Sequence, residues 1–338
     1  MTETINIAVI GCGQMGMHHA RVYRHMPGVK LLAICEADKQ RRDAASTELG
    51  CKGYADMEEM FSAHPEINGV SICMPDNKHL EAVEKAAAHK KHILLEKPIA
   101  SRLDEGKTIL DLVKNYDRVF TVGHLLRYDP RFFGLKEAID SGELGEIIHI
   151  SCRRNSPITG PRRYIGQSDL SMHVMIHDID IMNWFLNCPP VKVFARARSV
   201  LLKEHKMNDV IYAIITYENG AIVNMEASWV LPENSPTLID DQVEVVGTRA
   251  AAYIDACDKG LRFVGGEKGA DYPDTRHWPY VNGSPGGDLF AEISGFIAAI
   301  GSGTKPLCSA LDAYKALVVV EAIENSIAAG CEVTITTQ

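Results

Sequence analysis

The sequence predicts an α/β protein in which an N-terminal, doubly wound parallel sheet is followed by an α+β domain with a large, mostly antiparallel open sheet. Over residues 1–122, short and continuously apolar runs alternate with helical segments, as in parallel sheets covered by helices on both faces. A glycine-rich sequence joins the first apolar run to the first helix. After residue 123 the pattern changes to one long helical segment followed by strand-rich segments with a hairpin signal at Asn219-Gly220.

We therefore expect two domains, residues 1–122 and 123–338, which suits a chain of 338 residues. The expected strands of the first domain are residues 5–10, 31–35, 70–73, 93–95 and 119–122. Its expected helices are residues 14–26, 39–49, 56–64, 79–90 and 101–116. Pro27-Gly28 ends the first of these helices, and Ser101 with Asp104 resembles a capping box that opens the last.

In the second domain we expect one long helix at residues 168–186. Expected strands follow at residues 191–199, 210–217, 221–230, 243–246 and 251–255. Asn219-Gly220 is a strong hairpin signal between two of them. Helices are expected again at residues 288–300 and 309–329.

Composition narrows the class of partner and the compartment. A net charge of −9 disfavours nucleic acid and anionic membrane surfaces. No apolar run reaches the roughly 18 residues of a membrane helix, and we expect no signal peptide before the first strand. The nine cysteines include no Cys-x-x-Cys pair, which fits a reduced, cytoplasmic protein.

The sequence Gly11-Cys12-Gly13-Gln14-Met15-Gly16 is a G-x-G-x-x-G motif that follows an apolar strand and opens a helix. That context is what dinucleotide binding requires. Gly11 permits the tight turn, Gly13 lets the backbone approach a pyrophosphate, and Gly16 lets the helix pack closely on the sheet. The helix start at Gln14 and Met15 would then present N–H groups to the phosphates. A glycine turn without a ligand is the alternative.

The second strand ends at Glu36, 20 residues after Gly16. A carboxylate there can accept hydrogen bonds from the adenosine ribose and would repel a 2′-phosphate. This favours NAD over NADP, although Lys39, Arg41 and Arg42 follow closely. A solvated strand end is the alternative for Glu36.

Two more segments accompany the glycine turn: Met74-Pro75-Asp76-Asn77-Lys78-His79 after the third strand and Glu96-Lys97-Pro98 after the fourth. Together they resemble the Gfo/Idh/MocA oxidoreductases, the glucose–fructose oxidoreductase and inositol dehydrogenase family, over essentially the whole chain. Within that family, the segments most similar to inositol dehydrogenases are residues 122–129, Arg153-Arg154-Asn155 and His177-Asp178-Ile179-Asp180. The resemblance implies a Rossmann domain, a second domain with a large open sheet, and a homodimer or homotetramer built through that sheet.

The resemblance also implies that the cofactor contacts Pro75, Asn77, His79, Glu96 and Lys97. Lys97 lies at the carboxyl end of a parallel strand, where ligands bind in such sheets. Its ammonium can bond the nicotinamide ribose and the reacting oxygen, and can stabilise alkoxide character as hydride leaves. The resemblance gives Lys97 this catalytic role; a surface lysine before a helix is the alternative.

The expected helix at residues 168–186 is apolar on nearly all sides, so it should be buried. Even so, His173, His177, Asp180 and Trp184 follow one another at spacings of four, three and four, which places them on one face. His177 matches the family's catalytic histidine, a residue type suited to proton transfer near neutral pH. Asp180 matches a family position that contacts substrate hydroxyls. Core polar residues that satisfy each other are the alternative.

One position departs from the family, which has an aspartate four residues before the histidine where this chain has His173. Two neighbouring imidazoles disfavour double protonation. We therefore hypothesise that His177 is a base that stays neutral to lower pH, with His173 as relay or substrate contact. The two histidines with Asp178 and Asp180 could also suggest a metal site. We expect no metal, because the glutamate of zinc proteases is absent and a neighbouring lysine would repel a cation.

Further substrate contacts are candidates by position: Arg127, Tyr128, Arg154, Asn155 and Trp229. Arginine and asparagine donors suit a hydroxyl-rich ligand, and the indole could stack on a sugar face. Each could equally be structural, and the arginines around residues 153–163 could instead bind a phosphate or carboxylate.

The sequence thus predicts an NAD(P)-dependent oxidoreductase that oxidises a secondary hydroxyl of a cyclic polyol or sugar. An inositol is the first candidate, followed by a glycoside or nucleotide sugar oxidised at C3. Two alternatives stay open: a glycosidase or lyase that oxidises its sugar transiently, and a non-catalytic dinucleotide-binding sensor. The substrate, the direction of reaction and the choice between dimer and tetramer also stay open.

Overall fold

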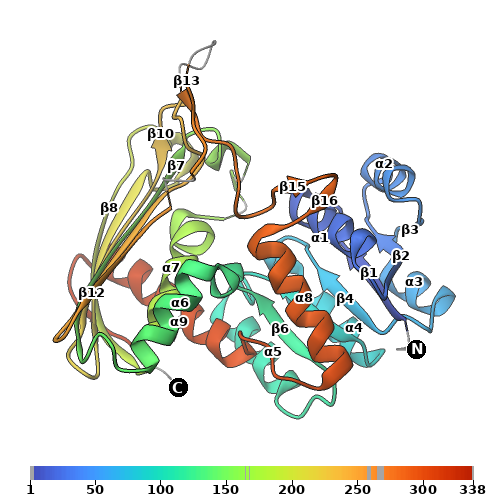
Figure 1. The fold of residues 1–338 in the computed structure, drawn as a ribbon, viewed down its shortest axis with the longest axis horizontal. Coiled ribbons are helices and arrows are strands. Elements are labelled where there is room, and N and C mark those ends of the chain that lie inside the picture. Colours follow the sequence, from blue (N-terminus) through green and yellow to red (C-terminus); the bar gives the residue numbers. More distant parts are fainter. Residues whose placement is uncertain (1–3, 164, 167, 257–259, 265–269, 337–338) are drawn as a thin grey trace. The chain divides into compact units, whose positions relative to one another are not determined.

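The computed structural model describes residues 4–163, 165–166, 168–256, 260–264 and 270–336 (Figure 1). The chain forms two compact units, and neither is a single stretch of sequence. The first unit is Met1–Tyr128 with Arg276–Tyr314, and the second is Asp129–Thr275 with Lys315–Gln338. The expected boundary after residue 122 lies close to Tyr128, where the chain first passes from one unit to the other. The return of residues 276–314 to the first unit was not foreseen.

The first unit contains the expected doubly wound parallel sheet, with strand order β3-β2-β1-β4-β5-β6. Its strands are β1 (Ile5–Ile10), β2 (Val29–Cys35), β3 (Lys52–Tyr54), β4 (Gly69–Ile72), β5 (His92–Glu96) and β6 (Phe120–Gly123). Its helices are α1 (Gln14–His25), α2 (Lys39–Leu49), α3 (Met57–Ala63), α4 (His79–Ala88) and α5 (Leu103–Val113), with 3₁₀ turns η1 (Asp76–Lys78) and η2 (Leu125–Tyr128). The order reverses between β1 and β4, which is where such sheets bind ligands.

Local sequence explains several helix ends in this unit, but the capping box expected at Ser101 is absent: the N-cap of α5 is Arg102, which makes no side-chain capping bond. The side chain of Asp38 accepts a hydrogen bond from the Arg41 N–H at the start of α2, at 2.8 Å. Asp56 does the same for the first N–H groups of α3. Gly50 ends α2 in the left-handed conformation that glycine adopts without strain.

Helix α8 (Gly287–Ser302) explains why the first unit is discontinuous. Its buried residues Leu289, Ile293 and Phe296 belong to the same hydrophobic core as Ile7 and Tyr23 of β1 and α1. Figure 1 shows α8 beside α1. The removal of this apolar stripe from water draws the segment back to the first unit.

The second unit is built on a seven-stranded mixed sheet of order β12-β11-β7-β10-β9-β8-β17. Its strands are β7 (Ile147–Pro157), β8 (Pro190–Arg198), β9 (Val210–Tyr217), β10 (Ile222–Leu231), β11 (Asp240–Gly247), β12 (Ala251–Asp255) and β17 (Val333–Thr334). Neighbouring strands are antiparallel except β7 and β10, which run parallel. The expected open and mostly antiparallel sheet is confirmed.

The remaining elements are helices and short hairpins. The helices are α6 (Pro130–Asp140), α7 (Ile176–Leu186) and α9 (Ala310–Ala329), with 3₁₀ turns η3 (Pro161–Arg163) and η5 (Lys203–His205). The hairpins pair β13 (Phe263–Val264) with β14 (Ala270–Asp271), and β15 (Tyr280–Val281) with β16 (Ser284–Pro285). None of the helices in the described part of the chain has the length and apolar character to cross a bilayer.

Strand β7 and helix α6 of the second unit escaped the sequence analysis, as did the short strands β13, β14 and β17. Strand β7, which pairs with both β10 and β11, carries polar residues such as Arg153, Arg154 and Asn155 in succession, so no apolar alternation marks it. Helix α6 begins at Pro130 behind the cap Asp129, whose side chain accepts from the Arg131 N–H at 2.9 Å.

The expected helix at residues 168–186 begins later and starts differently. A π-helical turn, Ser171–Met175, precedes α7, and the helix is buried on nearly all sides as expected. The regular α-helical spacing used to place His173 on the face of His177 therefore does not extend across the π turn. His177, Asp180 and Trp184 all lie within α7, where that spacing holds.

Helices α7 and α9 cover one face of the seven-stranded sheet (Figure 1). Ser326 of α9 fixes this packing, because its Oγ accepts from the Ala195 N–H of β8 at 2.9 Å and donates to the Cys331 carbonyl at 2.6 Å. The opposite face exposes large apolar side chains, among them Phe194, Tyr212, Ile214, Ile222 and Tyr253.

Candidate active site

The glycine turn between β1 and α1 depends on two very close approaches. Gly11 has a φ of +88°, and a Cβ there would lie 2.6 Å from the Cys73 carbonyl oxygen. A Cβ on Gly16 would lie 1.8 Å from the Gly11 carbonyl oxygen. Gly11 must therefore be glycine because of its positive φ and because a side chain would overlap the Cys73 carbonyl. Gly16 must be glycine because α1 packs directly onto the Gly11 carbonyl.

Gly13 has a different role, because a Cβ there would meet nothing within 4 Å. It is the N-cap of α1 and supplies no capping side chain. The start of the helix is thus lined by backbone, with exposed Gly13 and Gln14 and half-buried Met15. Open space beside a helix N-terminus fits a dinucleotide pyrophosphate, whose charge the N–H groups and the helix dipole would hold.

Glu36, at the end of β2, is buried against this turn. Its carboxylate accepts from the backbone N–H groups of Cys12 and Asp38, both at 2.9 Å, and from Arg41 Nη2 at 3.1 Å. Burial raises the pKa of Glu36, but these donors outweigh it and hold the pKa below its ordinary value. Glu36 is therefore tied to the turn. An ionised carboxylate has about four acceptor positions, so it can still accept from a hydroxyl.

The segment after β4 divides into exposed and buried positions. Pro75 and Asn77 are exposed and accessible to a ligand. His79 is buried, with Nδ1 2.8 Å from the Pro98 carbonyl oxygen and Nε2 3.0 Å from the Met74 carbonyl oxygen. His79 therefore joins the segments that follow β4 and β5, rather than presenting its ring to a cofactor.

Glu96 and Lys97 follow each other at the carboxyl end of β5. The Glu96 side chain is buried and accepts from the Lys97 backbone N–H at 3.1 Å, whereas Lys97 is half-buried. The Lys97–Pro98 peptide bond is cis. The lysine thus lies where the fold places ligands, as expected.

His19 of α1 is a functional candidate that the sequence analysis missed. It is fully buried, with Nε2 3.0 Å from Glu96 Oε1 and Nδ1 3.0 Å from Ser71 Oγ. Its position was visible in the sequence: Gly16, His19 and Tyr23 follow at helical spacing, so they share the face of α1 that packs on the sheet.

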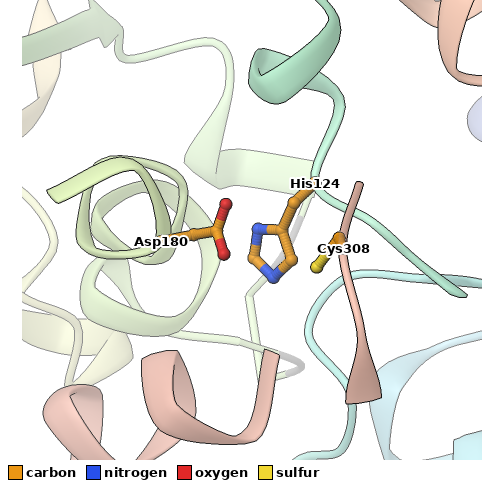
Figure 2. Close-up of side chains that lie close together, drawn as sticks. All are labelled: His124, Asp180 and Cys308. Carbon is orange, nitrogen blue, oxygen red and sulfur yellow. The ribbon is translucent and has the colours of Figure 1, made fainter. Parts of the chain in front are cut away.

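His124 and Cys308 also escaped prediction. Both are buried, and a ring nitrogen of His124 lies within 4.8 Å of Cys308 Sγ. Figure 2 shows the imidazole beside the thiol. His124 directly follows β6, and its place at the carboxyl end of a parallel strand was a usable signal. Cys308 offered none.

Arg127 and Tyr128 are held by the first unit itself. Arg127 is buried and donates to the Leu307 carbonyl at 2.6 Å, with Asp312 at 3.6 Å. Tyr128 is half-buried against α8, where a Cβ on Gly295 would lie 2.8 Å from its ring. Burial raises the pKa of the Tyr128 hydroxyl, so it stays protonated at neutral pH.

In the second unit, Asp180 is buried on α7 and is the side chain of that helix drawn in Figure 2. His177 and His173 are half-buried. The ring of His173 lies 6.4 Å from that of Trp229, centroid to centroid. The two histidines are therefore partly accessible, whereas Asp180 is covered.

Arg154 is buried in an ion-pair cluster that joins α7 to the sheet. Its guanidinium donates to Asp178 at 2.8 and 2.9 Å and to Asp241 at 2.6 Å. Burial lowers its pKa, but the two carboxylates outweigh that effect and raise it. Neighbouring Asn155 donates to Glu226 at 2.8 Å. Both residues, expected to contact substrate, are committed to contacts within the unit.

Trp229 is also committed to the core. Its side chain is only 1% exposed, and Nε1 donates to the Asn208 carbonyl at 2.7 Å. The ring therefore has no exposed face on which a sugar could stack.

One group in the first unit has the composition of a metal site. Ligand atoms of His19, Glu96 and Glu292 all lie within 4.8 Å of one another. Neither His173 nor His177 belongs to any such group of three among the residues that the structure describes.

Comparison with known sequences decides the family. The family model for an oxidoreductase family with an NAD-binding Rossmann fold matches residues 5–124, and the model of the corresponding C-terminal domain matches residues 132–253. The chain belongs to the Gfo/Idh/MocA oxidoreductase family. The expected NAD-binding Rossmann domain is thereby confirmed.

Relatives resemble the chain from end to end at low identity. The scyllo-inositol 2-dehydrogenase (NAD(+)) of Bacillus subtilis is 28% identical, over 98% of this chain and 97% of its own. The myo-inositol 2-dehydrogenase of Thermotoga maritima is 27% identical, over 96% of each chain. The structure of a scyllo-inositol dehydrogenase from Lactobacillus casei with NAD(H) and scyllo-inositol matches with a TM-score of 0.86 at 21% identity, covering 99% of this chain and 100% of that one. This last likeness supports the fold.

The unequal roles of the glycines can be tested with Gly16→Ala and Gly13→Ala. Gly16→Ala should destabilise the protein by at least about 2 kcal/mol, because the new methyl group overlaps backbone that cannot move freely. Gly13→Ala should leave stability nearly unchanged and weaken NADH binding by roughly tenfold, because its methyl group enters the space for the pyrophosphate. Urea unfolding and NADH fluorescence titration measure the two effects. Equal stability losses in both variants would contradict this assignment.

Proposed function

We propose that this protein is an NAD-dependent dehydrogenase that oxidises a secondary hydroxyl of a cyclic polyol, with an inositol as the first candidate substrate. One observation carries the proposal. The open glycine turn and Lys97 both lie at the carboxyl edge of the same parallel sheet, the turn after β1 and Lys97 after β5. The inositol dehydrogenases among its relatives support the substrate class.

The cofactor end follows from the chain's own residues. Gly13 and the start of α1 would hold the pyrophosphate, and Pro75 and Asn77 lie exposed after β4. Glu36 would accept from the adenosine ribose and disfavour a 2′-phosphate, so NAD is preferred over NADP. When bound, NAD supplies the acceptor for the hydride.

In the proposed reaction, Lys97 donates a hydrogen bond to the substrate oxygen and stabilises the negative charge that develops on it. His177 accepts the hydroxyl proton as general base. The resemblance to the family implies a carboxylate at residue 173, so in this chain an imidazole replaces an anion in the turn that precedes α7 and His177.

Substrate recognition is proposed for Asp180 and His173, with Tyr128 at the end of the first unit. Arg127 is left out, because it is buried and donates to the Leu307 carbonyl. Asp180 can accept from two hydroxyls of a polyol. Arg154, Asn155 and Trp229 are left out, because each is buried and bonded within the second unit. Arg154 instead holds α7, and hence His177, in place.

We further propose a cytoplasmic homo-oligomer that assembles through the exposed face of the seven-stranded sheet. That face carries aromatic and aliphatic side chains from β8, β9, β10 and β12, which is typical of a surface that becomes buried in an assembly. The cysteines within the described residues are free thiols, which suits a reducing compartment; Cys257 lies outside the described residues.

The activity can be tested by mixing the enzyme with NAD or NADP and a panel of inositols, free sugars and glycosides. We expect steady NADH absorbance with NAD and an inositol. Lys97→Met and His177→Gln should each lower kcat by about 100-fold or more while NADH binding persists, whereas Lys114→Met, an exposed lysine, should not. Turnover of a glycoside without NADH accumulation would indicate transient oxidation instead, and NADH binding without any turnover would indicate a sensor.

The departure at residue 173 makes a prediction about pH. His173→Asp should move the acid limb of the kcat/KM profile to higher pH by roughly one unit, because a carboxylate stabilises the protonated form of His177. His173→Gln is the control, since it removes the imidazole without adding charge. An acid limb that stays in place in His173→Asp would exclude electrostatic coupling between the two positions.

The assembly surface can be tested with Tyr212→Glu combined with Ile214→Glu on β9. Both side chains are about half exposed, at 49% each, so the charges should leave the folded subunit stable. Light scattering after size exclusion should show a smaller species than the unmodified protein. Leu112→Glu, on an exposed position of α5, is the matched control and should leave the assembly intact. A monomeric unmodified protein would refute the proposed interface.

A further inference from the structure

Three ionisable side chains meet in the core of the first unit, and the proposed reaction uses none of them. His19 comes from α1, Glu96 from β5 and Glu292 from α8. Their exposures are 0%, 6% and 2%. Charged side chains are seldom buried to this degree unless they are paired or have a function.

A continuous chain of hydrogen bonds runs through His19 and Glu96, and a carboxylate oxygen of Glu292 lies within 4.8 Å of both side chains. The Tyr23 hydroxyl lies 2.7 Å from Ser71 Oγ, which lies 3.0 Å from His19 Nδ1. His19 Nε2 lies 3.0 Å from Glu96 Oε1, and Glu96 Oε2 accepts from the Lys97 backbone N–H at 3.1 Å. The chain therefore ends on the residue that we assign to catalysis.

Burial restricts the protonation states that His19, Glu96 and Glu292 can adopt together. Two buried carboxylates this close cannot both ionise cheaply without a cation or a shared proton. The neighbours that favour an ionised Glu96 are His19 and Lys97. Strand β6 contributes no charge, because its residue beside Glu96 is Gly123, where a Cβ would lie 3.4 Å from Glu96 Oε1.

The other titratable neighbours are neutral. Loss of solvent raises the pKa of the Cys73 thiol well above its ordinary value. Burial likewise raises the pKa values of the Tyr23 and Tyr128 hydroxyls. Burial would also raise the pKa of Glu96, but the hydrogen bond and charge of His19, with the charge and N–H of Lys97, hold it below its usual value. An ionised Glu96 next to Lys97 is the consistent state.

We propose that His19, Glu96 and Glu292 form a buried proton-sharing network that keeps Lys97 protonated and in place, which makes Glu96 and His19 positioning residues for the reaction. This inference rests on the proposed function in one respect, the catalytic role of Lys97. Because electrostatic coupling is reciprocal, the carboxylate that Lys97 helps to ionise in turn stabilises the ammonium. A protonated Lys97 is the form that can stabilise a developing alkoxide.

The decisive comparison is Glu96→Gln against Glu96→Asp, with Lys97 titrated directly. Competitive labelling with acetic anhydride across pH, read by mass spectrometry, reports the midpoint at which each lysine becomes reactive. Glu96→Gln should move the Lys97 midpoint to lower pH by at least about half a unit, because it removes the anion. Glu96→Asp keeps the charge and should stay near the unmodified midpoint. Exposed Lys114 is the internal reference and should not change.

Two more variants guard against nonspecific effects. Tyr23→Phe removes a buried hydroxyl at the far end of the same chain and should leave the Lys97 midpoint unchanged. Glu292→Gln keeps the shape of a protonated carboxyl group and should leave the Lys97 midpoint near its unmodified value, and Glu96→Met serves if Glu96→Gln does not fold. An unchanged Lys97 midpoint in the variant without the Glu96 carboxylate overturns the network, and so does an equal shift in Glu292→Gln or Tyr23→Phe.

Activity separates this proposal from the proposed function. In Glu96→Gln, the alkaline limb of the kcat profile with an inositol should move to lower pH in step with the Lys97 midpoint, because Lys97 loses its proton earlier. A merely structural loss would lower kcat at every pH. A midpoint shift without turnover on any polyol supports the coupling and refutes only the proposed function. Stoichiometric metal in the purified protein would overturn the network, because His19 and Glu96 would then be ligands.

Discussion

The packing of α1 onto the glycine turn is the constraint on which the first unit depends. Gly16 brings the helix so close that any side chain there would overlap the Gly11 carbonyl. That single approach points the helix start at the space beside Gly13, where a pyrophosphate fits. It also lays His19 of the same helix against Glu96. One close contact therefore positions both the start of α1 beside Gly13 and the buried His19–Glu96 pair next to Lys97.

The second unit depends on a comparable constraint of a different kind. Arg154 on β7 bonds Asp178 on α7 and Asp241 on β11, so one buried guanidinium ties a helix to two strands. Loss of either carboxylate or of the arginine would destabilise the protein, because it leaves a buried charge without its partner. The residues it secures include His177, one position before Asp178 on the same helix. An arginine that looked like a substrate contact is thus a support for the proposed base.

Family membership establishes the class of protein, whereas the roles of single residues depend on their surroundings in this chain. The match over both domains establishes an oxidoreductase with an NAD-binding Rossmann fold. At under 30% identity, however, the individual site residues must be argued from this chain alone. The hydrogen bonds of Glu36 and Glu96 and the strand-end position of Lys97 support their proposed roles. His173 is proposed to act through its charge, with an effect on the pH dependence of the reaction rather than on the fold.

The sequence by itself determined the parallel sheet, the glycine turn and the place of Lys97, because these follow from short-range patterns: apolar runs, glycine spacing and strand ends. It could not reveal β7, whose polar residues are satisfied only by distant partners such as Asp241, nor the return of α8, whose apolar stripe needs α1 to cover it. Tertiary structure alone decided that Arg154 and Trp229 are used up in the core, and that His19 meets Glu96 across 77 positions of sequence. Partners that far apart are chosen by packing and burial, and no local pattern records them.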